Sequence, residues 1–292
     1  MLKSKIALGT VQFGLPYGIT NQAGQTSPAE AVKILSFAKS AEIDMLDTAI
    51  GYGDSEQVLG DVGFESFNIV TKLPALPKDQ VDVVQWVQQQ LEDSCERLKS
   101  SALYGVLLHR PADLQGDGGK ALARSLETLK EAQMVQKVGV SIYGPDDLAQ
   151  IGDISNIDLV QAPLNVVDRR LQISGWLHRL KDSGVEIHAR SAFLQGLLLM
   201  RRSNIPPKFE RWSRLWDEWH QFLSQTGTSA LSACLSYPLS LPEVDRVVVG
   251  VDSSEQLKDI LAAAEGIDHS IDTSFMVSTD TRLINPSRWS SL

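Results

Sequence analysis

Short apolar runs alternate along the chain with longer segments in which apolar residues recur at helical spacing. The runs are rich in β-branched residues and have the length of buried strands. We therefore predict eight strands, at Lys5–Gly9, Ile43–Asp47, Phe67–Lys72, Leu103–His109, Lys137–Ser141, Ile157–Gln161, Val185–Arg190 and Val244–Gly250.

The segments between these runs are typical of amphipathic helices. Val81–Leu98 shows the clearest stripe, because Val84, Val87, Leu91, Cys95 and Leu98 fall on one helical face. Another helix is expected over Pro28–Ala41, since Ser27 is a favourable N-cap and proline suits the first helical position. Further helices are predicted at Gly119–Ala132, Pro145–Ile151, Leu171–Lys181, Ser229–Tyr237 and Ser253–Ala264.

Repeated alternation of strand and helix implies parallel strands joined by right-handed crossovers. Eight such units in 292 residues predict a (β/α)8 TIM barrel. An open doubly wound sheet is the alternative, but that fold would place a GxGxxG turn after an early strand, and none is found there. No linker composition divides the chain, so residues 1–292 are expected to form one domain.

One segment breaks the alternation after the seventh predicted strand and indicates an insertion. It contains Trp212, Trp216 and Trp219, whose spacing of four and three places them on one helical face. These side chains could pin the insertion against the barrel or contact a ligand. We favour the first interpretation, because large aromatic side chains are mostly packing residues.

The composition narrows the classes of function. The net charge of −9 argues against a nucleic-acid partner, which would require a basic face. Cys95 and Cys234 lie far apart outside any metal-binding spacing, so no metal site or disulfide framework is indicated, and both are expected to be buried free thiols. The sequence shows no signal peptide and no apolar stretch of membrane-spanning length, so we expect a cytoplasmic protein without a membrane partner.

Polar residues close several of the predicted strands. Asp47, Lys72 and His109 each end an apolar run. In a closed barrel such residues would converge on one rim, where barrel enzymes place their catalytic groups. Taken singly, Asp47 could cap a turn, Lys72 could be a solvated strand end, and His109 could be a core histidine.

The residues resemble a known family, the aldo-keto reductases. LGTVQFG and MLDTAIGYGDSEQVLG match the first two family blocks, and VTKL, LLHRP, KVGVS, VQAPLN and VVVGVDSSEQL follow in the family's order. The resemblance covers nearly the whole chain and is most specific at the second block. It implies an NAD(P)H-dependent oxidoreductase whose catalytic tetrad is Asp47, Tyr52, Lys72 and His109.

These residue types suit carbonyl reduction. Hydride addition leaves charge on the carbonyl oxygen, and Tyr52 is the candidate proton donor. A free phenol has a pKa near 10, so the cation of Lys72, held charged by Asp47, would help to match Tyr52 to neutral pH. His109 would hydrogen-bond the carbonyl oxygen and orient the substrate.

The same resemblance implies a cofactor site. Ser141 and Gln161 would hold the nicotinamide carboxamide, and Arg190 stands where relatives carry a stacking aromatic residue. The expected cofactor is NADP(H), with NAD(H) as an alternative because Asp252 occupies a position that is often serine or basic. Arg201 and Arg202 could supply the missing positive charge. The full expected set is Gly9, Thr10, Ser141, Gln161, Arg190, Ser191, Leu194, Gly196, Gly250, Asp252, Ser253 and Gln256.

The predicted function is reduction of an aldehyde or ketone, with sugar-derived compounds among the candidates, to an alcohol. The alternative is a non-catalytic NADP(H)-binding sensor or regulatory protein on the same barrel. A barrel enzyme of another class, such as an isomerase, would leave the ordered family blocks unexplained. The partner is expected to be a small carbonyl substrate, and neither its identity nor the oligomeric state follows from the sequence.

Overall fold

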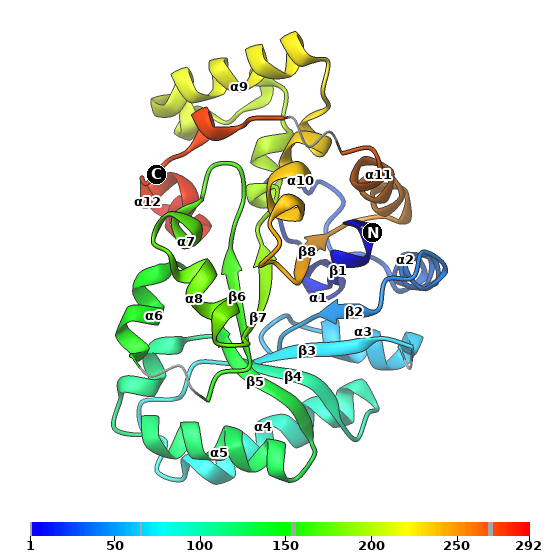
Figure 1. The fold of residues 1–292 in the computed structure, drawn as a ribbon. Helices are drawn as coiled ribbons and strands as arrows, with labels where there is room; N and C mark the ends of the chain where they lie inside the picture. The colour runs from blue at the N-terminus through cyan, green and yellow to red at the C-terminus, as the bar shows by residue number, and fades with distance from the viewer. Residues whose placement is uncertain (1, 65, 153–155, 268–270) are drawn as a thin grey trace.

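The computed structural model describes residues 2–64, 66–152, 156–267 and 271–292, and in these residues eight parallel strands close into one barrel (Figure 1). The strand order around the barrel is the order along the chain, and β1 pairs with β8 to close it. The predicted (β/α)8 fold is therefore confirmed. The strands are β1 (Ile6–Gly9), β2 (Met45–Asp47), β3 (Asn68–Leu73), β4 (Leu103–Leu108), β5 (Val135–Ser141), β6 (Leu159–Pro163), β7 (Glu186–Arg190) and β8 (Arg246–Gly250).

Helices surround this barrel on its outer side (Figure 1). They are α1 (Val11–Gly14), α2 (Pro28–Ser40), α3 (Ser55–Val62), α4 (Val83–Leu98), α5 (Gly119–Glu131), α6 (Pro145–Ile151), α7 (Arg170–Ile173), α8 (Trp176–Asp182), α9 (Ser213–Thr226), α10 (Ala230–Ser240), α11 (Ser254–Glu265) and α12 (Thr281–Ile284). Short 3-10 helices are η1 (Leu2–Lys5), η2 (Pro111–Gln115), η3 (Leu194–Leu199), η4 (Arg202–Asn204), η5 (Pro207–Trp212), η6 (Ser274–Met276) and η7 (Pro286–Ser291).

Local side chains fix several helix starts close to their predicted positions. The hydroxyl of Ser27 accepts the N–H of Glu30 at the start of α2, and the carboxylate of Asp82 accepts the N–H of Gln85 in α4. Because Asp82 is the N-cap, α4 begins at Val83, two residues later than the apolar pattern suggested.

The predicted helix over Leu171–Lys181 is wrong in one respect. The structure has two short helices there, α7 and α8, separated by Gly175. Gly175 has φ of 79°, a left-handed conformation that glycine adopts without steric cost and that interrupts a helix. The apolar pattern alone did not reveal this break, because it continues across the turn.

The barrel interior is layered. Side chains alternate between the interior and the helices along each strand, so residues two positions apart share a face. One separate apolar cluster brings together a residue from each of six strands: Ala7, Met45, Val70, Leu107, Leu159 and Val248. Met45, Val70 and Leu159 precede Asp47, Lys72 and Gln161 by two positions, so this cluster forms the floor beneath the predicted catalytic residues.

A polar network lies near the amino-terminal end of the strands. Glu186 accepts hydrogen bonds from the hydroxyl of Tyr104 and the ammonium of Lys137, and it pairs with the ring of His188. Burial acts to raise the pKa of Glu186, but these partners outweigh it and hold the pKa at about 2. This carboxylate is therefore ionised and paired. Its place at the amino-terminal end suggests a role in stability, because barrel active sites lie at the opposite end.

The predicted insertion lies between β7 and α10 and contains η3, η4, η5 and α9. Trp216 and Trp219 are fully buried on α9, and their indole N–H groups donate to the carbonyls of Phe209 and Leu198. Trp212 comes just before α9 and is only half-buried. The structure thus supports the packing interpretation for Trp216 and Trp219, which anchor α9 to the preceding segment.

Cys95 and Cys234 are both buried free thiols, as the sequence indicated. Burial raises the pKa of each thiol, so neither supplies a reactive thiolate at neutral pH. Among the described residues, no helix is long and apolar enough to cross a membrane.

We expect Trp216→Ala to destabilise the protein strongly, because it removes a buried side chain and leaves the Phe209 carbonyl without its donor. The loss in unfolding free energy should be about 3–5 kcal/mol by urea denaturation. Trp86→Ala, at a half-buried tryptophan on α4, is the matched control and should cost clearly less. Equal losses in the two variants would contradict the anchoring role of Trp216.

Candidate active site

The carboxyl ends of the strands surround one large cavity of about 680 Å³. This volume is typical of small-molecule and cofactor sites. Thirteen of the sixteen predicted site residues line it: Gly9, Thr10, Asp47, Tyr52, His109, Ser141, Gln161, Arg190, Ser191, Gly196, Gly250, Asp252 and Gln256. Lys72, Leu194 and Ser253 do not line it.

Lys72 lies below the cavity wall in a buried ion pair with Asp47. Its ammonium is 2.8 Å from both carboxylate oxygens of Asp47 and 2.8 Å from the carbonyl oxygen of Thr48. The three acceptors match the three protons of an ammonium group. Burial acts to lower the pKa of Lys72, but the charge of Asp47 and its hydrogen bonds outweigh burial and raise the pKa above its usual value. Lys72 is therefore a permanent cation.

Gln161 connects this ion pair to the opposite side of the barrel. Its amide N–H donates to Asp47 Oδ1 over 2.6 Å, and its carbonyl oxygen accepts a longer bond of 3.4 Å from the Ser141 hydroxyl. Strands β2, β5 and β6 are thus linked through side chains at one level of the barrel. The sequence identified Gln161 and Ser141 only as cofactor contacts, and the link to Asp47 emerges from the barrel geometry.

Tyr52 follows β2 and is positioned by a tight backbone contact. Gly14 packs so closely on this loop that an added Cβ would lie 1.7 Å from the Tyr52 carbonyl oxygen. Only glycine fits there, which gives a physical reason for the last glycine of the LGTVQFG block. The Tyr52 ring centroid is 5.1 Å from the Lys72 ammonium and 6.0 Å from the His109 ring, which meets it edge to face.

The pKa of Tyr52 is raised above its usual value, and burial is the largest cause. The cations of Lys72 and Arg190 act to lower the pKa, but they do not overcome burial and the negative charge of Asp47. As expected from the sequence, Lys72 acts to lower the pKa of Tyr52. The overall pKa of Tyr52 is nevertheless raised. The phenol therefore keeps its proton at neutral pH, as a proton donor requires.

His109 is neutral at physiological pH in this environment. Burial lowers its pKa to about 4, and the charges of Lys72 and Arg190 act in the same direction. A neutral imidazole can donate one hydrogen bond and accept another, so it can orient a polar group in the cavity without adding a charge.

A second layer of polar side chains holds the loop between β2 and α3. The hydroxyls of Thr10 and Thr48 each share a hydrogen bond with the Ser55 hydroxyl, and Ser55 also donates to the Thr10 carbonyl. Glu56, also buried, accepts from the hydroxyls of Thr71 and Ser94 and from the guanidinium of Arg97. Sequence reasoning missed these positioning roles, although Thr48, Ser55 and Glu56 all lie within the DTAIGYGDSE stretch.

The β7 side of the cavity carries a guanidinium group and several residues with left-handed backbone conformations. Arg190 donates to the Ile142 carbonyl over 2.9 Å, and its guanidinium lies 5.1 Å from the ring of Tyr143. Ser191, Leu194 and Gln195 have φ of 61°, 48° and 54°, a conformation that non-glycine residues adopt at an energetic cost. Tyr143 also lines the cavity, and sequence reasoning did not identify it.

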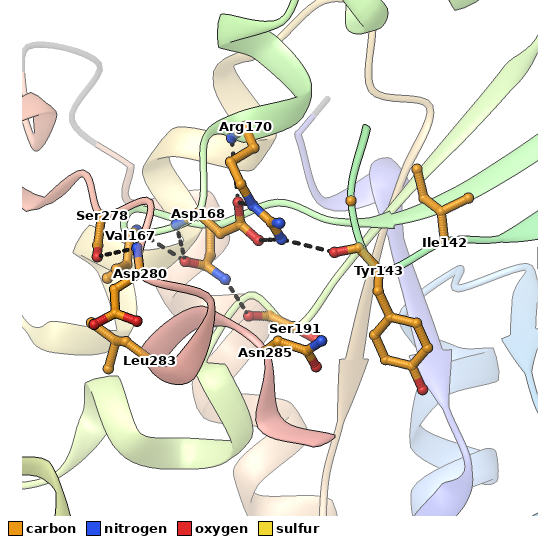
Figure 2. A network of polar contacts seen from close by, with 12 residues as sticks. Ile142, Tyr143, Val167, Asp168, Arg170, Ser191, Ser278, Asp280, Leu283 and Asn285 are labelled. Carbon is orange, nitrogen blue, oxygen red and sulfur yellow. Dashed lines mark hydrogen bonds and ion pairs between the residues drawn. The ribbon is translucent and has the colours of Figure 1, made fainter. Parts of the chain in front are cut away.

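The C-terminal segment reaches the same cavity. Figure 2 shows it beside the loops that follow β5, β6 and β7. The Ser278 N–H donates to the Val167 carbonyl, and the Asn165 amide donates to the Ser191 carbonyl, which joins the β6 loop to both neighbours. Pro286 and Ser287 then line the cavity. The C-terminal tail therefore contributes to the site.

The turn after β8 forms part of the cavity wall. Asp252 and Gln256 line the cavity, whereas Ser253 caps α11 by accepting the Gln256 N–H. Arg201 and Arg202 lie outside the lining residues, and Arg202 pairs with Asp217 and Glu210 on the surface. The structure thus gives no support to these two arginines as phosphate ligands.

Comparisons with known proteins agree with the architecture. The family model described as "Aldo/keto reductase family" matches residues 5–273. A 6-dehydroglucose reductase of Novosphingobium aromaticivorans is 32% identical over 165 residues, which span 51% of this chain and only 52% of that protein. The uncharacterized oxidoreductase YqkF of Bacillus subtilis is 24% identical over 89% of this chain and 87% of its own length.

Solved structures show the same fold at low sequence identity. The holo form of an aldo-keto reductase from Bacillus halodurans has a TM-score of 0.74, with 20% identity and 95% of each chain covered. A glycerol dehydrogenase from Gluconobacter oxydans has a TM-score of 0.67, with 21% identity over 89% of this chain and 86% of its own.

The buried ion pair allows a double-variant test. Lys72→Met leaves the Asp47 carboxylate buried without its cation, and we expect a loss of about 3–5 kcal/mol in unfolding free energy. Asp47→Asn combined with Lys72→Met removes both charges and should cost less than the single Lys72 variant. Urea denaturation of the wild type, both single variants and the double variant measures this coupling, and additive losses would contradict it.

The second test concerns His109 and acid stability. An unfolded histidine has a pKa near 6.5, so the unfolded chain binds more protons than the folded one between pH 6.5 and about 4. The contribution that neutral His109 makes to the free energy of unfolding is therefore lost as the pH falls from 6.5 to about 4. At pH 4.5 we expect a penalty of about 2 kcal/mol relative to pH 7.5. His109→Gln should lack this penalty, while the exposed-site control His178→Gln should retain it.

Proposed function

Because the chain belongs to the aldo/keto reductase family, we propose that it reduces an aldehyde or ketone to an alcohol, with a nicotinamide dinucleotide as hydride source and Tyr52 as proton donor. One observation carries this proposal. A protonated Tyr52 lies beside the buried Lys72–Asp47 pair and the neutral His109, at the wall of a cavity of about 680 Å³.

The cavity wall suits a dinucleotide. Gln12 Oε1 is a buried oxygen without a hydrogen-bond partner among the described residues, and Gln12 lines the cavity. Gly250 beside it has no side chain, and an added Cβ would lie 2.6 Å from the Gln12 amide nitrogen. Gln161, which bonds Asp47, and Ser141, which bonds Gln161, would hold the nicotinamide carboxamide. The unsatisfied buried acceptor favours a ligand that can donate a hydrogen bond.

The dinucleotide would supply the hydride, and the side chains of this chain would handle the charge and the proton. The neutral His109 would donate a hydrogen bond to the carbonyl oxygen and hold it near Tyr52. As the carbonyl carbon gains the hydride, its oxygen gains a negative charge and takes the phenolic proton of Tyr52.

The proton transfer leaves a phenolate on Tyr52. The cation of Lys72 would stabilise this phenolate from 5.1 Å, measured to the ring centroid. Asp47 keeps Lys72 charged, and Gln161 holds Asp47 in place through a hydrogen bond. Reversal of these steps would oxidise an alcohol with the same groups.

The substrate class that we propose is a small hydroxylated carbonyl compound, such as a sugar aldehyde or ketone. Two of the similar proteins bear names of this kind, a 6-dehydroglucose reductase and a glycerol dehydrogenase. The substrate end of the cavity also offers polar groups, among them Ser287 from the tail and the Tyr17 hydroxyl. The alternative function is a sensor that binds the dinucleotide without turnover.

We expect Tyr52→Phe to lower kcat about a hundredfold or more, because it removes the general acid. The dissociation constant of the dinucleotide should change less than about threefold, a difference of under ~1 kcal/mol. Steady-state assays with a panel of aldehydes and ketones, together with fluorescence titration of the dinucleotide, measure the two quantities.

Tyr237→Phe is the matched control, since its hydroxyl bonds Gln172 outside the cavity. This variant should keep the wild-type kcat. Near-normal turnover in Tyr52→Phe would remove Tyr52 from the reaction. Binding of the dinucleotide with no turnover of any carbonyl compound in the wild type would favour the sensor instead.

A further inference from the structure

The start of α11 already holds an anion that belongs to the protein. The carboxylate of Glu30, on α2, accepts the backbone N–H of Ser254 over 2.8 Å and the Ser254 hydroxyl over 2.9 Å. These bonds, together with Lys33, hold the pKa of Glu30 at about 2. Helix N-termini attract phosphates because they present N–H groups and a positive dipole end. Here one of those N–H groups is engaged by a carboxylate.

Other donors of the turn after β8 are also engaged within the protein. The N–H of Asp252 donates to the side-chain carbonyl of Gln256 over 2.7 Å. The N–H of Gln256 donates to the Ser253 hydroxyl over 3.3 Å. The turn therefore offers a phosphate group fewer donors than an open helix start would.

The cavity wall at this turn is acidic. Asp252 and Asp259 both line the cavity here, next to Gln256 and Ile260. The nearest lysine of the helix, Lys258, pairs with Glu255 and does not line the cavity. Among the described residues that line the cavity, Arg190 is the one lysine or arginine, and it lies on β7 beside Tyr143.

The position of this turn decides which part of a dinucleotide would meet it. The hydride-donating ring must lie near Tyr52, Ser141 and Gln161 for the proposed reaction. The other half of an extended dinucleotide must then lie along the remaining wall, which the β7 loop, the start of α10, the tail, and the turn after β8 with α11 form together. Within that wall, the carboxylates of the turn and of α11 can accept hydrogen bonds from ribose hydroxyls. The adenosine ribose would therefore lie near Asp252 and Asp259.

We propose that this acidic wall selects NADH over NADPH, with Asp252 as the acceptor for the 2′-hydroxyl of the adenosine ribose. The inference rests on the proposed function, since it requires a nicotinamide dinucleotide. A carboxylate accepts a hydrogen bond from a ribose hydroxyl but repels a 2′-phosphate. The proposal favours NAD(H), the alternative that the sequence left open beside the expected NADP(H).

Asp252 has the capacity for this bond. Its Oδ1 accepts one hydrogen bond, of 3.1 Å from the Asn21 amide, whereas a carboxylate can accept about four. The bond to Asn21 also connects the loop between α1 and α2 to the turn, which fixes the carboxylate at the cavity wall. Burial raises the pKa of Asp252, and the neighbouring Gln256 side chain acts in the opposite direction.

Equilibrium binding tests the proposal without any turnover. Isothermal titration of the wild type with NADH and NADPH should show NADH binding at least about tenfold more tightly, which corresponds to ~1.4 kcal/mol. The fragments 5′-ADP and 2′,5′-ADP, which lack the nicotinamide, should show the same order. The preference should shrink as salt is raised from about 0.05 M to 0.5 M, because repulsion between charges is screened.

Asp252→Asn tests the residue and keeps its shape. We expect the ratio of NADPH to NADH affinity to rise about tenfold in this variant, the effect of removing ~1.4 kcal/mol of discrimination. Glu255→Gln is the matched control, because it removes one charge from the same helix outside the cavity. Its affinity ratio should change less than about twofold, or under ~0.5 kcal/mol.

The outcomes separate the two proposals. Tighter or equal binding of NADPH in the wild type overturns the cofactor inference and leaves the proposed function intact. An unchanged ratio in a folded Asp252→Asn overturns the role of that residue. If Asp252→Asn does not fold, the fragment comparison in the wild type still decides the preference. Binding of neither dinucleotide overturns the proposed function together with the inference.

Discussion

The buried ion pair between Lys72 and Asp47 is the interaction on which the candidate site depends. Two opposite charges in the barrel interior are stable only if each meets its partner and the remaining hydrogen-bonding groups are satisfied. Thr48 and Gln161 complete that set. The pair in turn provides a fixed cation beside Tyr52, whose phenol burial keeps protonated. Loss of either charge would disturb both the fold and the chemistry.

The barrel makes this arrangement possible through its layers. Side chains at alternate positions point inward, so an apolar floor of small and branched residues lies directly below the polar residues of the rim. The floor excludes water from below, which strengthens the electrostatic interactions above it. The polar network of Glu186, Lys137, Tyr104 and His188 closes the opposite end of the interior.

Different loops contribute different parts of the cavity wall. The tail supplies Pro286 and Ser287 to the cavity, and the segment that leads to it bonds the β6 loop through the Ser278 N–H and the Thr273 hydroxyl (Figure 2). The loop after β7 keeps several non-glycine residues in left-handed conformations, which are unfavourable for the backbone. Hydrogen bonds that Asn165 and Tyr17 make with this loop help to stabilise it in that conformation. The η3 part of the insertion lines the cavity, whereas α9, anchored by Trp216 and Trp219, lies away from the strands in Figure 1.

The sequence by itself determined the eight alternating units, the barrel and the identity of the catalytic candidates, because apolar periodicity and local motifs are encoded in neighbouring residues. It did not determine the net pKa shift of Tyr52, the link from Gln161 to Asp47, the role of Tyr143, or the exclusion of Arg201 and Arg202 from the cavity. It also gave no sign that Glu30 engages the start of α11. Each of these depends on residues far apart in the chain that only the closed barrel brings together, and on burial, which no local pattern measures.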